Sequence, residues 1–301
     1  MTGASHQTPA QRPAARELHE RLAAAEARHR QDLHAVFWQR SLRQQATLFA
    51  LLLLLWQLPV FNPIKLLVVL FHELSHTVAA YATGGIVFGI AIDPGGAGVT
   101  LGIGGWLPGI VVAGYAGSLL FGALLYYLCA IWEAREVWFA LTVCAFGSLA
   151  LRFFNDFTAS FMVGTLILLT AGLRLRPSWQ QTLLRLVATS SCLYPLIDVL
   201  GEVVTRERSG FTYNGVVVGS DVGQLALLTG LSVWLLALIW ITIGAAAVVW
   251  LMMTTATLEA QTEVKKSILP PPPPKGDQGH RIDKRLVYTS RGPYTSEYTI
   301  P

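Results

Sequence analysis

A series of long apolar segments, separated by short polar or glycine-rich breaks, fills the chain from residue 46 to residue 253. Hydrophobic residues make up 53% of the 301 residues and charged residues only 13%, whereas soluble domains usually have about 25% charged residues. Helices of about 20 apolar residues can cross a bilayer because their backbone hydrogen bonds are all internal. The sequence therefore predicts an all-α polytopic membrane protein.

Seven apolar segments can be separated, but two neighbouring pairs are weakly divided. Pro59 and Asn62-Pro63 interrupt the first pair, and residues 152–156 interrupt a later pair. Proline and turn-forming residues end or kink helices, so each break allows either two crossings or one interrupted element. We therefore expect six or seven transmembrane helices. The segments cover approximately residues 46–60, 64–82, 107–131, 137–151, 157–173, 183–203 and 231–253.

Residues 84–105 differ from these segments because nine of them are glycines and their apolar residues alternate around Asp93-Pro94-Gly95-Gly96. Alternation around a turn-forming centre predicts a short Gly-rich β-hairpin. The edge of such a hairpin could bind an unwound peptide as an added strand, which would satisfy the peptide's backbone at membrane depth. A hairpin without substrate contact is the alternative.

Both ends of the chain are polar. Residues 1–45 contain seven arginines and four acidic residues and predict a polar N-terminal helical segment that is not a cleavable signal peptide. Residues 255–301 contain five consecutive prolines and predict a disordered or polyproline-like tail, which acts as a spacer or docks on an adaptor domain. A transmembrane domain over residues 46–254 lies between these ends.

The charge distribution indicates orientation and partners. Each polar end carries seven Lys or Arg residues, so the positive-inside rule predicts that both termini are cytosolic and that the number of crossings is even. Because the net charge is only +4 and the basic residues lie mainly at the ends, no nucleic-acid-binding surface is expected. The three cysteines lie in apolar segments without metal-type or paired spacing, so neither a disulfide framework nor a cysteine-bound metal is expected.

The motif His72-Glu73-Leu74-Ser75-His76 stands inside the second apolar segment. Helical positions four apart differ by ~40° in azimuth and ~6 Å in height, so His72 and His76 can present two imidazole nitrogens to one ion. Glu73 lies at a neighbouring azimuth, close enough to hold a water beside that ion and to accept its proton. This spacing is typical of zinc peptidases.

Composition and location both make this motif informative. A chain with 7 His and 11 Glu among 301 residues should contain about 0.006 HExxH motifs by chance. Ionisable residues in a lipid-depth helix are costly unless they are paired, so they indicate a functional site. The structural alternative is that both histidines hydrogen-bond to neighbouring helices while Glu73 is neutral or paired.

Four segments, HELSHTVAAYATGG, IAIDPGGAGVT, AGYAGSLLFG and LRFFNDFT, resemble the intramembrane zinc metallopeptidases of the site-2-protease type, in particular the compact members without a PDZ domain. The likeness covers approximately residues 64–230, with its strongest part at HExxH and the glycine-rich segment. The resemblance implies a multi-span helical core and one zinc ion within the membrane. It also implies His72 and His76 as metal ligands and Glu73 as general base.

The third ligand is less clear, because the Asn-Pro and Leu-Asp-Gly motifs of that family are absent in this spelling. Catalytic zinc usually has three protein ligands, and most acids after His76, Asp221 among them, fall in predicted loops or turns. Asp156 is the first choice because its place in the chain matches the order of ligand helices in the resembled family. Asp198 is the rival, and capping of the following helix is the non-ligand alternative for Asp156.

These features predict a zinc-dependent intramembrane metalloprotease that hydrolyses membrane-embedded or membrane-proximal peptides, with Zn²⁺ as cofactor and membrane proteins and the lipid bilayer as partners. Small residues four apart, Ala113 with Gly117 and Gly114 with Ser118, allow close helix packing, and the resemblance implies that the partner is the zinc helix. Ordinary helix packing is equally consistent with them. One alternative is a catalytically inactive relative that acts as a membrane scaffold or metal-binding protein. A transporter is the other, although the internal repeat common in transporters is not found.

Overall fold

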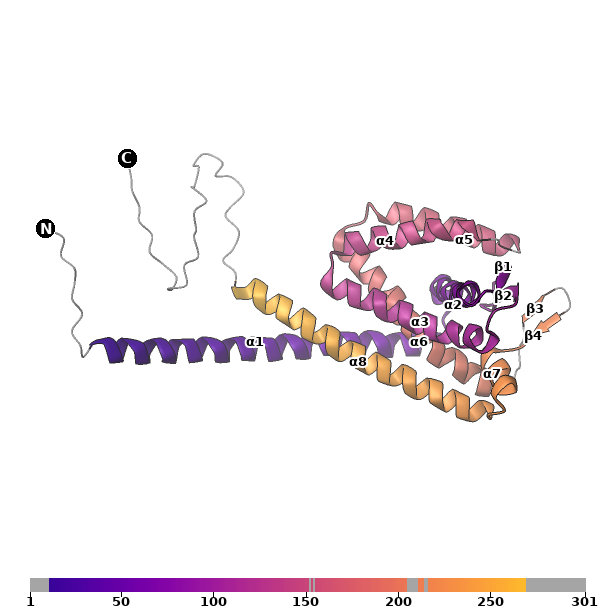
Figure 1. The fold of residues 1–301 in the computed structure, drawn as a ribbon. Helices are drawn as coiled ribbons and strands as arrows, with labels where there is room; N and C mark the ends of the chain where they lie inside the picture. Colours follow the sequence, from indigo (N-terminus) through magenta and orange to yellow (C-terminus); the bar gives the residue numbers. More distant parts are fainter. Residues whose placement is uncertain (1–10, 152, 154, 205–210, 214–215, 269–301) are drawn as a thin grey trace.

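The computed structural model describes residues 11–151, 153, 155–204, 211–213 and 216–268, and helices account for most of them (Figure 1). The helices are α1 (Gln11–Leu55), α2 (Asn62–Ala82), α3 (Leu107–Ile131), α4 (Ala134–Gly147), α5 (Asp156–Gly172), α6 (Pro177–Val204), α7 (Asp221–Thr229) and α8 (Val233–Ile268). Two antiparallel strand pairs accompany them, β1 (Ile86–Ile92) with β2 (Gly98–Ile103) and β3 (Phe211–Tyr213) with β4 (Val216–Val218). Short 3₁₀ turns stand at Pro59–Phe61 and Ser148–Ala150.

Among the described residues, four helical segments are long and apolar enough to cross a membrane, as an integral membrane protein requires. A further apolar helix, α5, has 17 residues and extends roughly 25 Å at ~1.5 Å per residue, which is less than a ~30 Å hydrocarbon core. The predicted helical membrane fold with a small hairpin is confirmed at this level, while the count of six or seven crossings stays a prediction. The four segments are Pro59–Ala82, Leu107–Ile131, Pro177–Gly201 and Val233–Ile268.

The first and last helices are longer than the sequence predicts. α1 runs without a break from the polar segment into the apolar one, across the expected boundary at residue 45. α8 continues to Ile268, so the prediction of a disordered tail from residue 255 is wrong for residues 255–268. The proline run lies outside the described residues.

The reason for the extended α8 is its antiparallel packing on α1 through buried polar residues. Ser41 on α1 donates a hydrogen bond to Glu259, and one turn later Gln45 accepts a hydrogen bond of 3.1 Å from Thr255. These polar groups lie between the helices, where hydrogen bonds to each other replace hydrogen bonds to water. Tertiary packing therefore continues the helix past the point where the composition changes.

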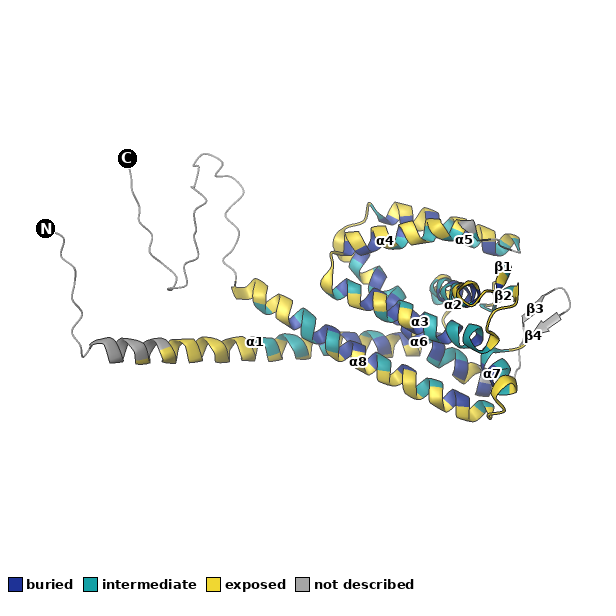
Figure 2. Cartoon of the chain, in the orientation of Figure 1, coloured by how far each residue is buried: buried dark blue, intermediate teal, exposed yellow. Residues whose placement is uncertain are grey.

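α2 lies at the centre of the fold, where Figure 1 shows it nearly end-on while α3 and α8 run across the view. It contacts α3, α6 and both strands of the first hairpin, and Val68, Val69 and Leu70 on it are almost fully buried. Exposed residues gather on the outer faces of α4, α5 and α8 (Figure 2). Large apolar side chains such as Leu168 and Trp250 are among them, as expected for a surface that faces lipid.

The predicted hairpin is confirmed between α2 and α3. Ile92 of β1 pairs with Gly98 of β2, and the Asp93 side chain accepts a hydrogen bond from the Gly95 amide in the turn. The end of β1 is attached to the start of α5, because the Thr158 hydroxyl accepts a hydrogen bond of 2.7 Å from the Ile92 amide. The hairpin is thus attached to α5 and also contacts α2.

Candidate functional site

His72 and His76 lie on one face of α2, as their spacing predicts. Their ring centroids are 4.6 Å apart in an edge-to-face arrangement, and the residues are only 5% and 7% exposed. Two imidazole nitrogens therefore point into one buried space. The helix that carries them begins at Asn62, and Pro63 in its first turn fits there because the first amides of a helix have no intrahelical partner.

The acid that meets these histidines is Asp221, which the sequence analysis placed in a loop. Its Oδ2 atom lies 2.8 Å from His72 Nε2 and 3.0 Å from His76 Nε2. Asp221 is the first residue of α7, and the Ser220 side chain caps this helix by accepting a hydrogen bond from the Gly223 amide. The cap fixes the first turn, and this turn carries the carboxylate to the two imidazoles.

The electrostatics of this group favour an ionised carboxylate. Burial opposes ionisation of Asp221, but hydrogen bonds from His72 and His76 and the positive charge of these imidazoles when protonated outweigh burial and lower the pKa of the Asp221 carboxyl from its ordinary value. The ionised carboxylate and two imidazoles, once these are neutral, are a donor set that suits Zn²⁺.

The three side chains also fit a metal in position, and the tautomer of His76 suits a ligand bond. Their ligand atoms all lie within 4.8 Å of one another, and no other such group occurs among the described residues. Zinc–nitrogen and zinc–oxygen bonds of ~2.0–2.1 Å in a tetrahedron separate the ligand atoms by roughly 3.3 Å, a few tenths of an ångström more than the two distances from Asp221 Oδ2 to the imidazole nitrogens. His76 Nδ1 donates to the Ile110 carbonyl at 2.6 Å, which leaves the lone pair of Nε2 for a ligand bond.

Glu73 lies beside this group without belonging to it. The residue is only 4% exposed, and it interacts electrostatically with His76, His72 and Asp221. The Thr100 hydroxyl on β2 donates a hydrogen bond of 2.7 Å to Glu73 Oε2. A buried carboxylate next to a metal-type donor group can accept and return a proton there.

α3 approaches α2 closely at the two histidines. A Cβ atom on Gly114 would lie 2.5 Å from Cε1 of both His72 and His76, and a Cβ atom on Gly117 would collide with Ser75. Two of the small residues noted in the sequence, Gly114 and Gly117, therefore face the helix that carries the motif. The missing side chain of Gly114 gives the imidazoles their space, and that of Gly117 leaves room for Ser75.

The structure does not bring Asp156, the predicted third ligand, into this group. Asp156 is exposed in the first turn of α5, and Asn155 caps that helix by accepting a hydrogen bond from the Thr158 amide. The rival Asp198 on α6 is nearer, since it interacts electrostatically with His72 and is hydrogen bonded to Tyr194. Asp221 was missed because it follows a short strand pair in a polar stretch; the available signal was Ser220 as a helix cap before the apolar run of α7.

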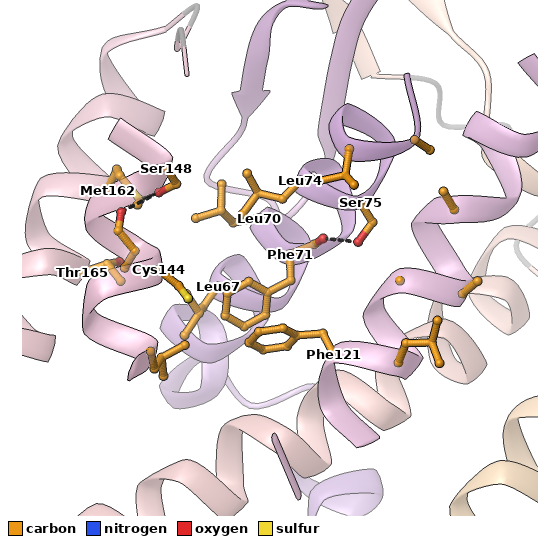
Figure 3. Close-up of a pocket in the computed structure, with 18 of the residues that line it drawn as sticks. Leu67, Leu70, Phe71, Leu74, Ser75, Phe121, Cys144, Ser148, Met162 and Thr165 are labelled. Carbon is orange, nitrogen blue, oxygen red and sulfur yellow. Dashed lines mark hydrogen bonds between the residues drawn. The ribbon is translucent and has the colours of Figure 1, made fainter. Parts of the chain in front are cut away.

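A separate apolar cavity of about 460 Å³ lies between α2 and α3 on one side and α4 and α5 on the other (Figure 3). The Ser75 hydroxyl at its wall donates to the Phe71 carbonyl within α2, and Thr165 donates to the Phe161 carbonyl within α5. Neither histidine of the motif lines this cavity. The cavity therefore offers apolar surface, while the chemical groups lie on another face of α2.

Comparison with known families gave one match. The family model described as Peptidase M50B-like matches residues 45–251, which is more than half of the chain and includes all three grouped side chains. No curated protein and no solved structure gave a significant match.

Proposed function

Because the chain belongs to the Peptidase M50B-like family, a family of the site-2-protease type, we propose that it is a zinc-dependent protease that cleaves membrane-embedded or membrane-proximal peptides. The observation that carries this proposal is the buried group of His72, His76 and Asp221 with the Glu73 carboxylate beside it. The four long apolar helices support a substrate that is also in or near the membrane.

His72, His76 and Asp221 would hold the zinc ion, with Asp221 replacing Asp156 as the third ligand. A zinc ion at this position would supply Lewis acidity toward a peptide carbonyl and toward water. The Ile110 carbonyl orients the His76 ring, and the missing side chain of Gly114 leaves room for both rings. These neighbours preorganise the donor set.

Glu73 would act as the general base and then as the general acid. Its carboxylate accepts a proton from the attacking water, whose oxygen forms a bond to the scissile carbonyl carbon. The same carboxyl group then donates that proton to the nitrogen of the breaking C–N bond, so that an acid and an amine are released. A helical substrate must unwind locally before its carbonyl group can be attacked, and the β1–β2 hairpin is a candidate edge for the unwound segment.

The first prediction concerns Glu73→Gln. The amide keeps the shape of the side chain but cannot accept a proton, so zinc binding should persist while peptide cleavage falls by at least about 100-fold. Zinc per chain is measured by elemental analysis of the purified protein, and cleavage is measured with a library of single-span peptides in liposomes. Undiminished cleavage by this variant would contradict the role of Glu73. Zinc binding without cleavage by the wild-type chain would favour an inactive relative.

The second prediction separates the candidate third ligands. Asp221→Ala should reduce both bound zinc and cleavage, because two imidazoles alone hold zinc weakly. Asp156→Ala should leave zinc content unchanged, because Asp156 is exposed on α5. Asp198→Ala tests the remaining rival under the same conditions. Full zinc occupancy in Asp221→Ala together with zinc loss in Asp156→Ala would reinstate the assignment made from the sequence.

A further inference from the structure

We propose that Thr100 on β2 is a positioning residue that orients the Glu73 carboxylate for proton transfer. This inference rests on the proposed function of Glu73 as general base. It assigns the β1–β2 hairpin a role in holding the reacting group, separate from any role in binding a substrate strand.

The contact joins the hairpin to the end of the Glu73 side chain. Thr100 Oγ1 lies 2.7 Å from Glu73 Oε2 and 3.0 Å from the Glu73 backbone oxygen. A hydroxyl has one proton, and the shorter distance favours its donation to the carboxylate. No hydrogen bond engages Oε1 within the described ranges, so one carboxylate oxygen is held by Thr100 and the other is left for proton transfer.

Gly98, on the same face of β2 as Thr100, also limits where the Glu73 carboxylate can lie. Side chains two residues apart in a strand point to the same side, and Gly98 stands two residues before Thr100. A Cβ atom on Gly98 would collide with Glu73 Oε1 and would lie 2.8 Å from Glu73 Cγ. β2 therefore lies close to Glu73. It presents the Thr100 hydroxyl to the carboxylate at one position and no side chain at Gly98.

The hairpin that carries Thr100 is held in place by the buried second half of β1. Thr100 pairs with Ile90 of β1, and Ile90 and Ile92 are completely buried. Glutamate has three side-chain torsions, and a base that must reach one water loses efficiency when its carboxylate samples other rotamers. A donor on β2 that is held by pairing with the buried Ile90 restricts those torsions.

Thr77 offers a matched comparison within the same helix. Its hydroxyl donates a hydrogen bond of 3.0 Å to the Glu73 backbone oxygen, and no hydrogen bond joins it to the carboxylate in the described part of the chain. Thr77→Val thus removes a buried hydroxyl near Glu73 without releasing the carboxylate. Thr100→Val removes a hydroxyl that holds it.

The experiment compares Thr100→Val, Thr100→Ser and Thr77→Val in the purified full-length chain, with a peptide that the wild type cleaves in liposomes. Thr100→Val should lower kcat by about 10- to 100-fold, less than the ~10²–10⁴-fold that base catalysis itself contributes, with KM and zinc content unchanged. Thr100→Ser, which keeps the hydroxyl, should retain kcat within about 3-fold of wild type, as should Thr77→Val. Equal kcat losses in Thr77→Val and Thr100→Val, or zinc loss in Thr100→Val, would overturn the positioning role.

A second readout needs no substrate. Thr100→Val, Glu73→Ala and the double variant form a cycle whose Tm changes are measured in detergent, because alanine, unlike glutamine, leaves no acceptor for the Thr100 hydroxyl. The Tm loss of the double variant should be smaller than the sum of the two single losses, whereas the Thr77→Val and Glu73→Ala losses should add. Additive losses for Thr100 and Glu73 would refute the contact whether or not cleavage is observed. If Glu73→Gln cleaves normally while the Thr100 losses are non-additive, the proposed function fails and the contact stands.

Discussion

At the scale of single residues, the two imidazoles have their space because position 114 is a glycine, which has no Cβ atom. Gly114 on α3 stands so close to α2 that even a methyl group would press on Cε1 of both His72 and His76, at 2.5 Å. Contacts that short force rings or backbone to move, and overpacking of this kind typically costs about 1–3 kcal/mol. Even the smallest side chain at position 114 is therefore expected to displace the imidazoles.

We predict that Gly114→Ala reduces bound zinc by more than about half and lowers Tm, because displaced imidazoles no longer meet Asp221. Zinc per chain and thermal unfolding of the purified protein measure the two effects. The control is Gly164→Ala on α5, where a Cβ atom would meet nothing within 4 Å. A chain that keeps full zinc after Gly114→Ala would show that the rings can shift and still hold the metal.

The sequence predicts the first part of this site better than the rest. His72 and His76 are adjacent because a helix repeats every 3.6 residues, and that geometry is local. Asp221 is 149 residues away from His72 along the chain, and its position depends on how α7 packs after a strand pair. No sequence spacing connects His72 with Asp221. Elimination of the acids in apparent loops left Asp156 and Asp198, and the order of ligand helices in the resembled family then favoured Asp156.

At the scale of elements, the junction of β1 with α5 is a compact set of hydrogen bonds. Thr158 accepts from the Ile92 amide and Asn155 Nδ2 donates to the Ile92 carbonyl, at 2.7 Å and 3.0 Å. Asn155 Oδ1 also accepts from the Thr158 amide at 2.8 Å, so one residue caps the helix and binds the strand. The hairpin that carries Thr100 is thereby attached to α5.

We predict that Thr158→Val destabilises this junction. The variant leaves the buried Ile92 amide without its acceptor, and an unsatisfied buried group costs about 1–3 kcal/mol. Tm should fall, and hydrogen exchange at the Ile92 amide should become faster. Ser160→Ala, on an exposed position of the same helix, is the control and should change neither. Unchanged exchange at Ile92 in Thr158→Val would show that another group satisfies the amide.

The elements themselves were predictable where their signals are long or dense. The hairpin followed from nine glycines within residues 84–105 and a turn at Asp93, and α3 begins and ends where its apolar run does. α7 has only 9 residues and β3 and β4 have 3 each, so their patterns are too short to separate from a loop. The extension of α8 depends on its partners on α1, and a single segment does not reveal such partners.

At the scale of the whole molecule, the antiparallel packing of α1 and α8 determines where the two polar ends project. Ser41 meets Glu259 and Gln45 meets Thr255, so the start of α1 and the end of α8 extend in the same direction (Figure 1). This arrangement agrees with the basic composition of both ends.

We predict that both ends of the chain lie on the cytosolic side of the membrane, because seven Lys or Arg residues stand in each polar end. Epitope tags at the two ends should be digested together when protease is added to the cytosolic face of sealed vesicles, and both should be protected in vesicles of opposite orientation. A lumenal tag of known orientation serves as control. Protection of one tag and digestion of the other would require an odd number of crossings.

Because His72 and Asp221 are far apart in the chain, the group that they form with His76 can assemble only late in biosynthesis. Translation at ~5–20 residues per second needs roughly 7–30 s to pass through the 149 positions between them. α3 follows α2 early and can already provide the Ile110 carbonyl to His76, but the carboxylate of α7 does not yet exist. A nascent chain therefore enters the bilayer with its three-donor group incomplete. The proposed cleavage activity therefore cannot arise until most of the chain has been made.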